Sequence, residues 1–155
     1  MPALSQNFTF TVNSTSTVQI TYPVNTATGA VSYTSEPLKG DGYFSNSDGF
    51  HTVQVNLTEF QGAVDIYGTL ATEPAEGDWV AIGLEAPGAL ASNRYVIDTT
   101  GLISLAGSTP TSNINYSITA TTISSTFNFV GNYVWLRAKV SNWTSGAVTS
   151  IELNR

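Results

Sequence analysis

The chain between residues 51 and 79 reads HTVQVNLTEFQGAVDIYGTLATEPAEGDW. Apolar and polar residues alternate on both sides of the central FQG, over residues 53–57 and again over 64–70. This period of two is typical of β-strands that bury one face. We therefore predict two strands joined by a tight turn at Gly62 and leading to a buried aromatic residue, Trp79.

A second stretch near the C-terminus, GNYVWLRAKVSNWTSGAVTSIELNR (residues 131–155), follows the same plan. It predicts an alternating strand, a connection that contains Gly146, and a second alternating strand that ends the chain. The first of these strands has an apolar face and a face of aromatic and basic residues. The apolar face carries Val134, Leu136, Ala138 and Val140, and the other carries Tyr133, Trp135, Arg137 and Lys139.

The remainder of the chain adds shorter strand signals and no convincing helix. Alternation predicts a hairpin over residues 8–22 and further strands near 30–34, 94–98, 102–105 and 114–126. A length of 155 residues suits one hydrophobic core. The fold class expected is all-β, a single antiparallel β-sandwich of jelly-roll-like layout over residues 1–155, with residues 1–22 as an N-terminal arm or edge hairpin.

Composition excludes several classes of function. Only 10% of the residues are charged, the net charge is −6, and the five basic residues are scattered, so no basic face is expected to bind nucleic acid. The chain has no cysteine and therefore no disulfide or thiolate chemistry. It has no apolar run long enough to span a membrane and no secretion signal, so we expect no membrane partner.

The residues that could perform catalysis do not form a recognisable arrangement. His51 is the only histidine, and beside Phe50 at the start of a strand we interpret it as structural rather than catalytic. No GxSxG sequence is present. Asp65 could pair with another carboxylate across a cleft, but any set of acids offers such combinations. We predict a protein that is not an enzyme and has no catalytic residues.

Two acidic, glycine-containing stretches could offer hard oxygen ligands to Ca²⁺. They are GDGYFSNSDG, with Asp41 and Asp48, and ATEPAEGDW, with Glu73, Glu76 and Asp78. Neither has the ordered spacing of an EF-hand, and Asp and Gly also dominate turns for backbone reasons. Turn formation is the favoured interpretation, so no metal and no cofactor is predicted.

Aromatic residues outside the alternating core admit two interpretations. Those in question are Tyr43, Phe44 and Phe50 in the glycine-rich loop, and Trp135 and Trp143 in the last segment. They could stack on a sugar, or they could pack in the core or against a neighbouring subunit. Since Tyr133 and Trp135 lie opposite an apolar face, leaving them exposed is unfavourable, and a subunit interface is a reasonable hypothesis.

The two stretches together resemble small virion structural proteins of tailed bacteriophages, of the cyanophage type. The similarity lies in a GTLA…P…DW string after a strand, at residues 68–79, in GNYVW at 131–135, and in a terminal strand with Gly146, Ile151, Leu153 and Arg155. It covers roughly the last two thirds of the chain. The layout is also similar to a discoidin-like jelly roll, although the basic ligand loops usual in discoidin domains are missing.

The resemblance implies a non-enzymatic building block of a phage particle, such as a decoration, fibre, neck or baseplate protein. Such a protein would be made in the host cytoplasm, reside in the virion, and contact copies of itself and other virion proteins. The residues proposed for the interface are Phe8 and Phe10 as an anchoring arm, with Tyr133, Trp135, Arg137 and Trp143. The alternative is a carbohydrate-binding module or receptor-binding fibre tip, for which a glycan is the ligand.

Overall fold

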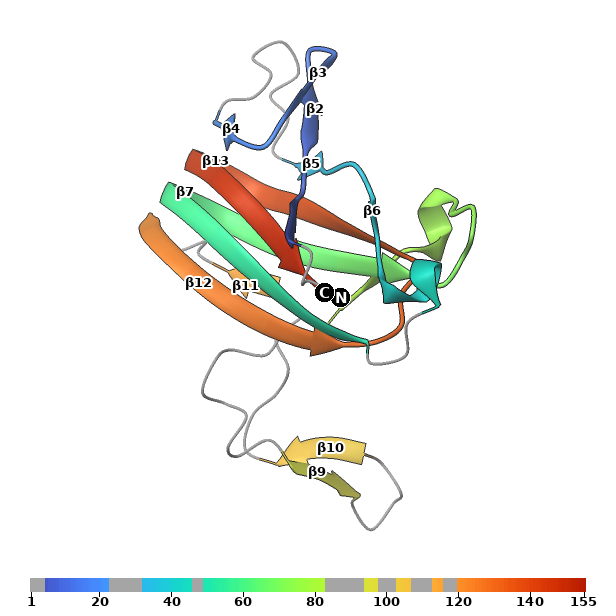
Figure 1. The fold of residues 1–155 in the computed structure, drawn as a ribbon. Coiled ribbons are helices and arrows are strands. Elements are labelled where there is room, and N and C mark those ends of the chain that lie inside the picture. The colour runs from blue at the N-terminus through green and yellow to red at the C-terminus, as the bar shows by residue number, and fades with distance from the viewer. Residues whose placement is uncertain are drawn as a thin grey trace.

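The computed structural model describes residues 5–22, 32–45, 49–82, 94–97, 103–106, 113–115 and 120–155, and in this part of the chain nearly all regular structure is β-strand (Figure 1). The helical segments described are two short 3₁₀ turns, η1 (Asp41–Phe44) and η2 (Glu76–Asp78). All strand pairs described are antiparallel. The prediction of an all-β, antiparallel, sandwich-like fold is confirmed.

Two long strands form the centre of the sheet. β7 (Phe50–Thr69) and β13 (Trp135–Asn154) are each 20 residues long and pair along almost their whole length, from Trp135 opposite Thr69 to Asn154 opposite Thr52. The two turns predicted within these segments are therefore wrong. Each segment is one continuous strand that bends where a chain reversal was expected.

The bends arise from irregular pairing halfway along both strands. The β7–β13 register shifts between Ser141 and Ser145 and again before Ala147, and the residues there include Glu59 (φ 46°), Asn142 (φ 48°) and Gly146 (φ 79°) in the left-handed region. Extra residues of this kind form β-bulges, which bend a strand and change which side chains face inward. The long sheet therefore curls, as Figure 1 shows.

Short N-terminal strands pair in succession along the outer edge of β13. They are β1 (Ser5–Asn7), β4 (Ile20–Thr21), β5 (Tyr33–Thr34) and β6 (Leu38–Lys39). Between the first two, β2 (Phe10–Val12) and β3 (Thr15–Thr17) form a hairpin, whose turn residues Asn13 and Ser14 both have positive φ. The predicted N-terminal hairpin is thus present, but its second strand begins earlier than expected, and residues 5–7 belong to the main sheet.

The outer edge of β7 is lined in the same way by β8 (Val80–Ala81), β11 (Asn113–Asn115) and β12 (Thr121–Val130). β9 (Arg94–Ile97) and β10 (Ile103–Ala106) pair with each other, close to where the sequence predicted strands. From one edge to the other the sheet therefore runs from the N-terminal strands through β13 and β7 to β8, β11 and β12. The jelly-roll layout is not confirmed by this strand order.

The core lies inside the curl and draws mainly on β7 and β13, with further side chains from residues 8–20, Ile82 and β12. Its largest fully buried side chains include Trp143, Phe8, Phe10 and Phe60. Phe8, Phe10 and Trp143 are each 0% exposed, so three of the six residues proposed for an interface are wrong: they fill the interior of the subunit. Phe8 is also fixed by its backbone, because its N–H donates to the carbonyl of Ile151 at 2.9 Å.

Candidate functional site

His51 is buried beside a carboxylate, which was not foreseen. Its ring is 0% exposed, lies parallel to the ring of Phe129 with centroids 4.7 Å apart, and places Nε2 3.8 Å from Oδ2 of Asp41, itself 2% exposed. Nδ1 is 3.0 Å from the carbonyl oxygen of Gly49. A carbonyl oxygen can only accept, so Nδ1 carries a proton and Nε2 faces the carboxylate.

This pair joins the 3₁₀ turn η1 to the beginning of β7, and both of its side chains are buried. The turn is held against residues 132–133 by backbone contacts: the N–H of Gly42 donates to the carbonyl of Tyr133 at 2.9 Å. A Cβ at Gly40 or Gly42 would collide with carbonyl oxygens of that segment. The arrangement supports the structural interpretation of His51.

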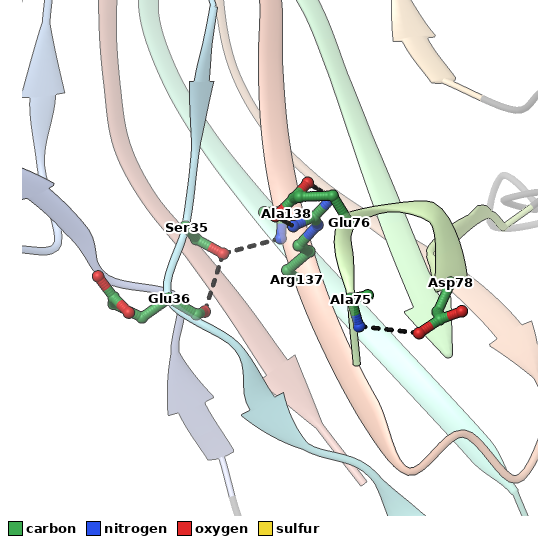
Figure 2. Close-up of polar contacts among 7 residues, drawn as sticks. All are labelled: Ser35, Glu36, Ala75, Glu76, Asp78, Arg137 and Ala138. Carbon is green, nitrogen blue, oxygen red and sulfur yellow. Dashed lines mark hydrogen bonds and ion pairs between the residues drawn. The ribbon is translucent and has the colours of Figure 1, made fainter. Parts of the chain in front are cut away.

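The acidic stretch at residues 73–78 forms a turn in which two of the carboxylates, those of Glu76 and Asp78, have protein partners. Oδ2 of Asp78 accepts from the N–H of Ala75 at 2.8 Å, and Glu76 binds Arg137 (Figure 2). Asp41 faces His51 instead of solvent, and Asp48 lies outside the described residues. Within the ranges that the structure describes, no cluster of three His, Asp or Glu side chains could hold a metal ion.

Arg137 lies on the outer face of β13 at the centre of a small cluster. Both of its terminal nitrogens are 3.0 Å from the two carboxylate oxygens of Glu76, and its guanidinium lies 4.3 Å above the ring of Trp79. Tyr67, the cross-strand neighbour of Arg137, is 5.9 Å away on another side. The arginine side chain is 14% exposed, so its own chain covers most of this residue, which was proposed to contact a partner.

Trp135 and Tyr133 are each half-buried. The indole N–H of Trp135 donates to the carbonyl of Thr72 at 3.0 Å, and its ring meets that of Tyr43 at 62°, with centroids 5.1 Å apart. Lys39 lies 4.2 Å above the same tyrosine ring. The aromatic rings here meet edge to face, so they do not form the flat, coplanar platform expected for sugar stacking.

Tyr133 closes the end of the core next to Gly68 and Gly131, where a Cβ would collide with its ring. Burial raises the pKa of its hydroxyl above the ordinary value of 10.0. Tyr133 and Trp135 therefore have the intermediate exposure that an interface requires, but each already packs against its own chain.

We expect Arg137→Ala to destabilise the protein more than Glu76→Gln does. Arg137 rests on Trp79 and excludes water from it, whereas Glu76 is 87% exposed, and exposed ion pairs contribute little. Arg137→Ala should lower the free energy of unfolding by about 1 kcal/mol. Arg137→Lys keeps the charge but loses the bidentate hydrogen bond, so the loss of unfolding free energy measured in urea should lie between those of the other two variants. Equal effects of Arg137→Ala and Glu76→Gln would contradict this.

The same pair makes a small part of the stability depend on pH. The hydrogen bond from Arg137 lowers the pKa of Glu76 below its ordinary value of 4.5. A lowered pKa means that the contribution is complete above pH 4.5 and disappears as the pH falls through the folded-state value.

Asp65 lies on the outer face of β7, opposite Lys139 of β13. It is 9% exposed, and burial raises the pKa of its carboxyl group above the ordinary 3.8 in spite of the attraction of Lys139, which acts to lower it. A raised pKa means that the folded protein holds more protons than the unfolded chain between 3.8 and the folded-state value. Stability therefore decreases as the pH rises through that interval.

We expect Asp65→Asn to be more stable than the wild type at pH 7, because the amide avoids the cost of burying a carboxylate. The gain should shrink as the pH is lowered below 3.8, when the wild-type carboxyl group is protonated in both states. Thermal unfolding at pH 3 and pH 7 measures both effects. As a control, Lys139→Met should lower stability at pH 7 in the wild type and much less in Asp65→Asn. A loss of stability in Asp65→Asn at pH 7 would show that the pair is net stabilising.

A broad polar face covers the outside of the other half of the sheet. We define it by the outward residues of β1, β13, β7 and β12, none of which is buried: Ser5, Asn7, Thr149, Ser150, Glu152, Asn154, Thr52, Gln54, Asn56, Thr58, Thr122, Ser124, Thr126 and Asn128. Glu152 is the single ionisable member. Hydrogen bonds run across the strands, such as Asn56 Nδ2 to Ser150 Oγ at 2.7 Å and Thr52 Oγ1 to Asn128 Oδ1 at 2.9 Å.

This polar face was missed by the sequence analysis, although its signal is present. Ser, Thr, Asn and Gln occupy alternate positions opposite the valines of residues 51–57 and opposite the aromatic residues of 121–130. What the sequence could not supply is the register that sets these strands side by side.

No protein-family model matches the chain, and no curated protein matches it. Among solved structures it is similar to the SPBc2 prophage-derived protein YomS, with a TM-score of 0.45 and 13% identity over 99% of this chain and 95% of that one. None of the helices in the described residues has the length and apolarity needed to cross a bilayer.

Proposed function

We propose that this protein is a non-enzymatic structural component of a bacteriophage virion, assembled as a homo-oligomer through the faces of its β-sheet. The observation that supports this best is that the two strings behind the phage resemblance meet in space. Thr69 pairs with Trp135, and Glu76 and Trp79, from the first string, hold Arg137 next to the second. Residues far apart in the sequence thus form one continuous piece of structure.

The described chemistry is compatible with a building block. The acid–base pair Asp41–His51 is buried, and the carboxylates of Glu76 and Asp78 bind their own chain. Exposed apolar side chains remain at the ends of the strands and are available for contacts with copies of the chain or with other virion proteins. They include Phe50, Val130, Leu70 and Val80, which are 51–71% exposed.

Light scattering of the purified chain at micromolar concentration tests the assembly. A mass well above the 16.4 kDa of one chain is expected, and a monomer at all concentrations would reject the proposal. Mass spectrometry of gradient-purified phage particles tests the location, because a decoration, fibre, neck or baseplate protein must remain with the particle. Recovery of the chain only in the unassembled fraction would exclude a role in the virion.

The alternative is a carbohydrate-binding module or receptor-binding fibre tip. The polar face favours it, because neutral hydroxyl and amide groups in a nearly uncharged array match the donors and acceptors of a glycan. A glycan array would reveal such binding, and Asn56→Ala combined with Gln54→Ala should abolish it. An array without signal above background would eliminate this alternative.

A further inference from the structure

Strand β12 forms one edge of the sheet, as Figure 1 shows. It pairs with β7 on one side, and no other described strand pairs with it. Along an antiparallel edge, alternate residues direct N–H and C=O groups outward, where they can accept another strand. The segment Thr122–Val130, TISSTFNFV, is well suited to this because it contains no charged residue, proline or glycine.

Natural proteins usually protect such an edge with lysine, with proline, or with a bulge that twists the edge away from an incoming strand. β12 has its irregularity at the beginning, between Thr121 and Ile123, and pairs regularly from Ile123 to Val130. Over Ile123–Val130 the described part of the chain therefore provides no lysine, proline or bulge that would hinder the pairing of another strand.

Two apolar side chains of β12 are incompletely covered. Ile123 and Phe127 face the core but are only partly buried, in contrast to Phe129 at 3% exposed. Their exposed parts lie at the boundary of the core, where the sheet stops. A strand added alongside β12 would continue the sheet and cover them.

The sequence of β12 matches itself when turned end to end. In an antiparallel pair, residues opposite each other share a face. A two-fold axis at Ser125 places Ile123 opposite Phe127 of the second copy, Ser124 opposite Thr126, and Thr122 opposite Asn128. Apolar residues thus lie opposite apolar ones on the core side, and polar residues lie opposite polar ones on the outside. This match is the same for either set of alternate residues that could direct its backbone N–H and C=O groups outward.

Charge favours the same strand. The chain carries a net charge of −6, so two copies repel each other across most of their surfaces, and an uncharged edge is where that repulsion is smallest. Pairing there would also join the two polar faces into one.

We propose that β12 is a self-association edge: two copies pair antiparallel through Thr122–Asn128, with the two-fold axis at Ser125, and extend the sheet from one subunit into the next. This inference rests on the proposed function, for which it names the partner as a second copy and adds backbone pairing at a sheet edge to the contacts through the sheet faces. A contact of this kind is isologous and gives dimers or other even-numbered assemblies.

Paired charge variants test the register. Ser124 and Thr126 are both exposed and are opposite each other across the proposed axis. The double variant Ser124→Lys with Thr126→Lys places like charges opposite and should raise the dissociation constant roughly tenfold or more. Ser124→Lys with Thr126→Glu places opposite charges there and should keep the wild-type affinity. Both variants remove the same two hydrogen bonds within the subunit, one that Ser124 accepts from Gln54 and one that it donates to Asn56, so each controls for the folding of the other.

Cysteine cross-linking tests the axis directly, because the wild-type chain has no cysteine. Residues opposite each other in an antiparallel pair have Cα atoms roughly 4.5–5.5 Å apart, within reach of a disulfide. Ser125→Cys should therefore give a covalent dimer under mild oxidation. Ser150→Cys, a half-buried serine on a central strand, is the matched control and should remain largely monomeric on a non-reducing gel.

The outcomes separate this inference from the proposed function. The wild type could be an oligomer whose dissociation constant is unchanged in the double lysine variant and whose Ser125→Cys variant does not cross-link. That result would overturn the edge proposal and leave the proposed assembly standing. An odd-numbered assembly such as a trimer would likewise overturn the edge proposal and leave the proposed assembly standing. A wild-type monomer would overturn both.

Discussion

Phe8→Ala is expected to lower the free energy of unfolding by about 3–5 kcal/mol, the cost typical of removing a fully buried phenylalanine side chain. Phe8 is 0% exposed and belongs to the main core cluster. A loss of this size is a large fraction of the stability of a domain of this size. Urea unfolding monitored by tryptophan fluorescence should show a much lower midpoint with little change in slope.

Phe50→Ala is the matched control, because Phe50 is 51% exposed at the end of β7. Its effect on the monomer should be within about 0.5 kcal/mol. If Phe8 were instead an anchoring residue of a loose arm, Phe8→Ala would change assembly and leave the unfolding midpoint unchanged. That result would show that the N-terminal segment is not part of the core.

Gly146→Ala is expected to destabilise the protein by roughly 2 kcal/mol or more, because φ at this residue is 79° and an L-residue is strained there. In addition, a Cβ would meet the backbone of Glu59 and would come within 2.6 Å of the nitrogen of Phe60. The two bent strands could no longer approach each other at the bend. Thermal unfolding should show a clear fall in the melting temperature.

Gly77→Ala provides the comparison. A Cβ at Gly77 would have no described atom within 4 Å, and Gly77 is exposed in η2. The change should therefore leave the melting temperature nearly unaltered. Equal effects at the two glycines would show that the bend at Gly146 does not depend on its backbone conformation.

Local pattern was sufficient to place most strands. Alternation at residues 53–57 and 64–70 predicted strand in both places, and the structure has strand throughout, from Phe50 to Thr69. The same holds for the last segment and for β9 and β10. These predictions succeeded because a period of two follows directly from the geometry of an extended chain with one buried face.

The prediction failed at the joints between alternating segments. The side chains of the core cluster are at odd positions from Val53 to Leu57 and at even positions from there on, namely Phe60, Val64 and Ile66. A tight turn and a β-bulge both allow such a change of phase, so the alternation pattern in the sequence does not distinguish a turn from a bulge. The structure has bulges, because the two halves of β7 remain paired with the same strand, β13, throughout.

The candidate surfaces were predictable only in part. Trp135 and Arg137 were expected on the outer face of their strand, and they lie there, but the turn carrying Glu76 and Trp79 covers Arg137, and Thr72 and Tyr43 contact Trp135. Which distant segment lies over a given face depends on long-range packing, which no local pattern contains. For the same reason Trp143 was proposed for the surface but lies in the core.

The sequence by itself determined that this chain is β-structured, poor in charged residues and free of thiol chemistry, since these properties follow from residue types and their spacing. Tertiary structure alone decided that β7 and β13 bend together, that His51 meets Asp41, and that β12 forms an edge. Those features depend on register and on contacts between segments up to a hundred residues apart. Such contacts form only when the whole core is assembled, because no single segment buries enough apolar surface to hold them alone.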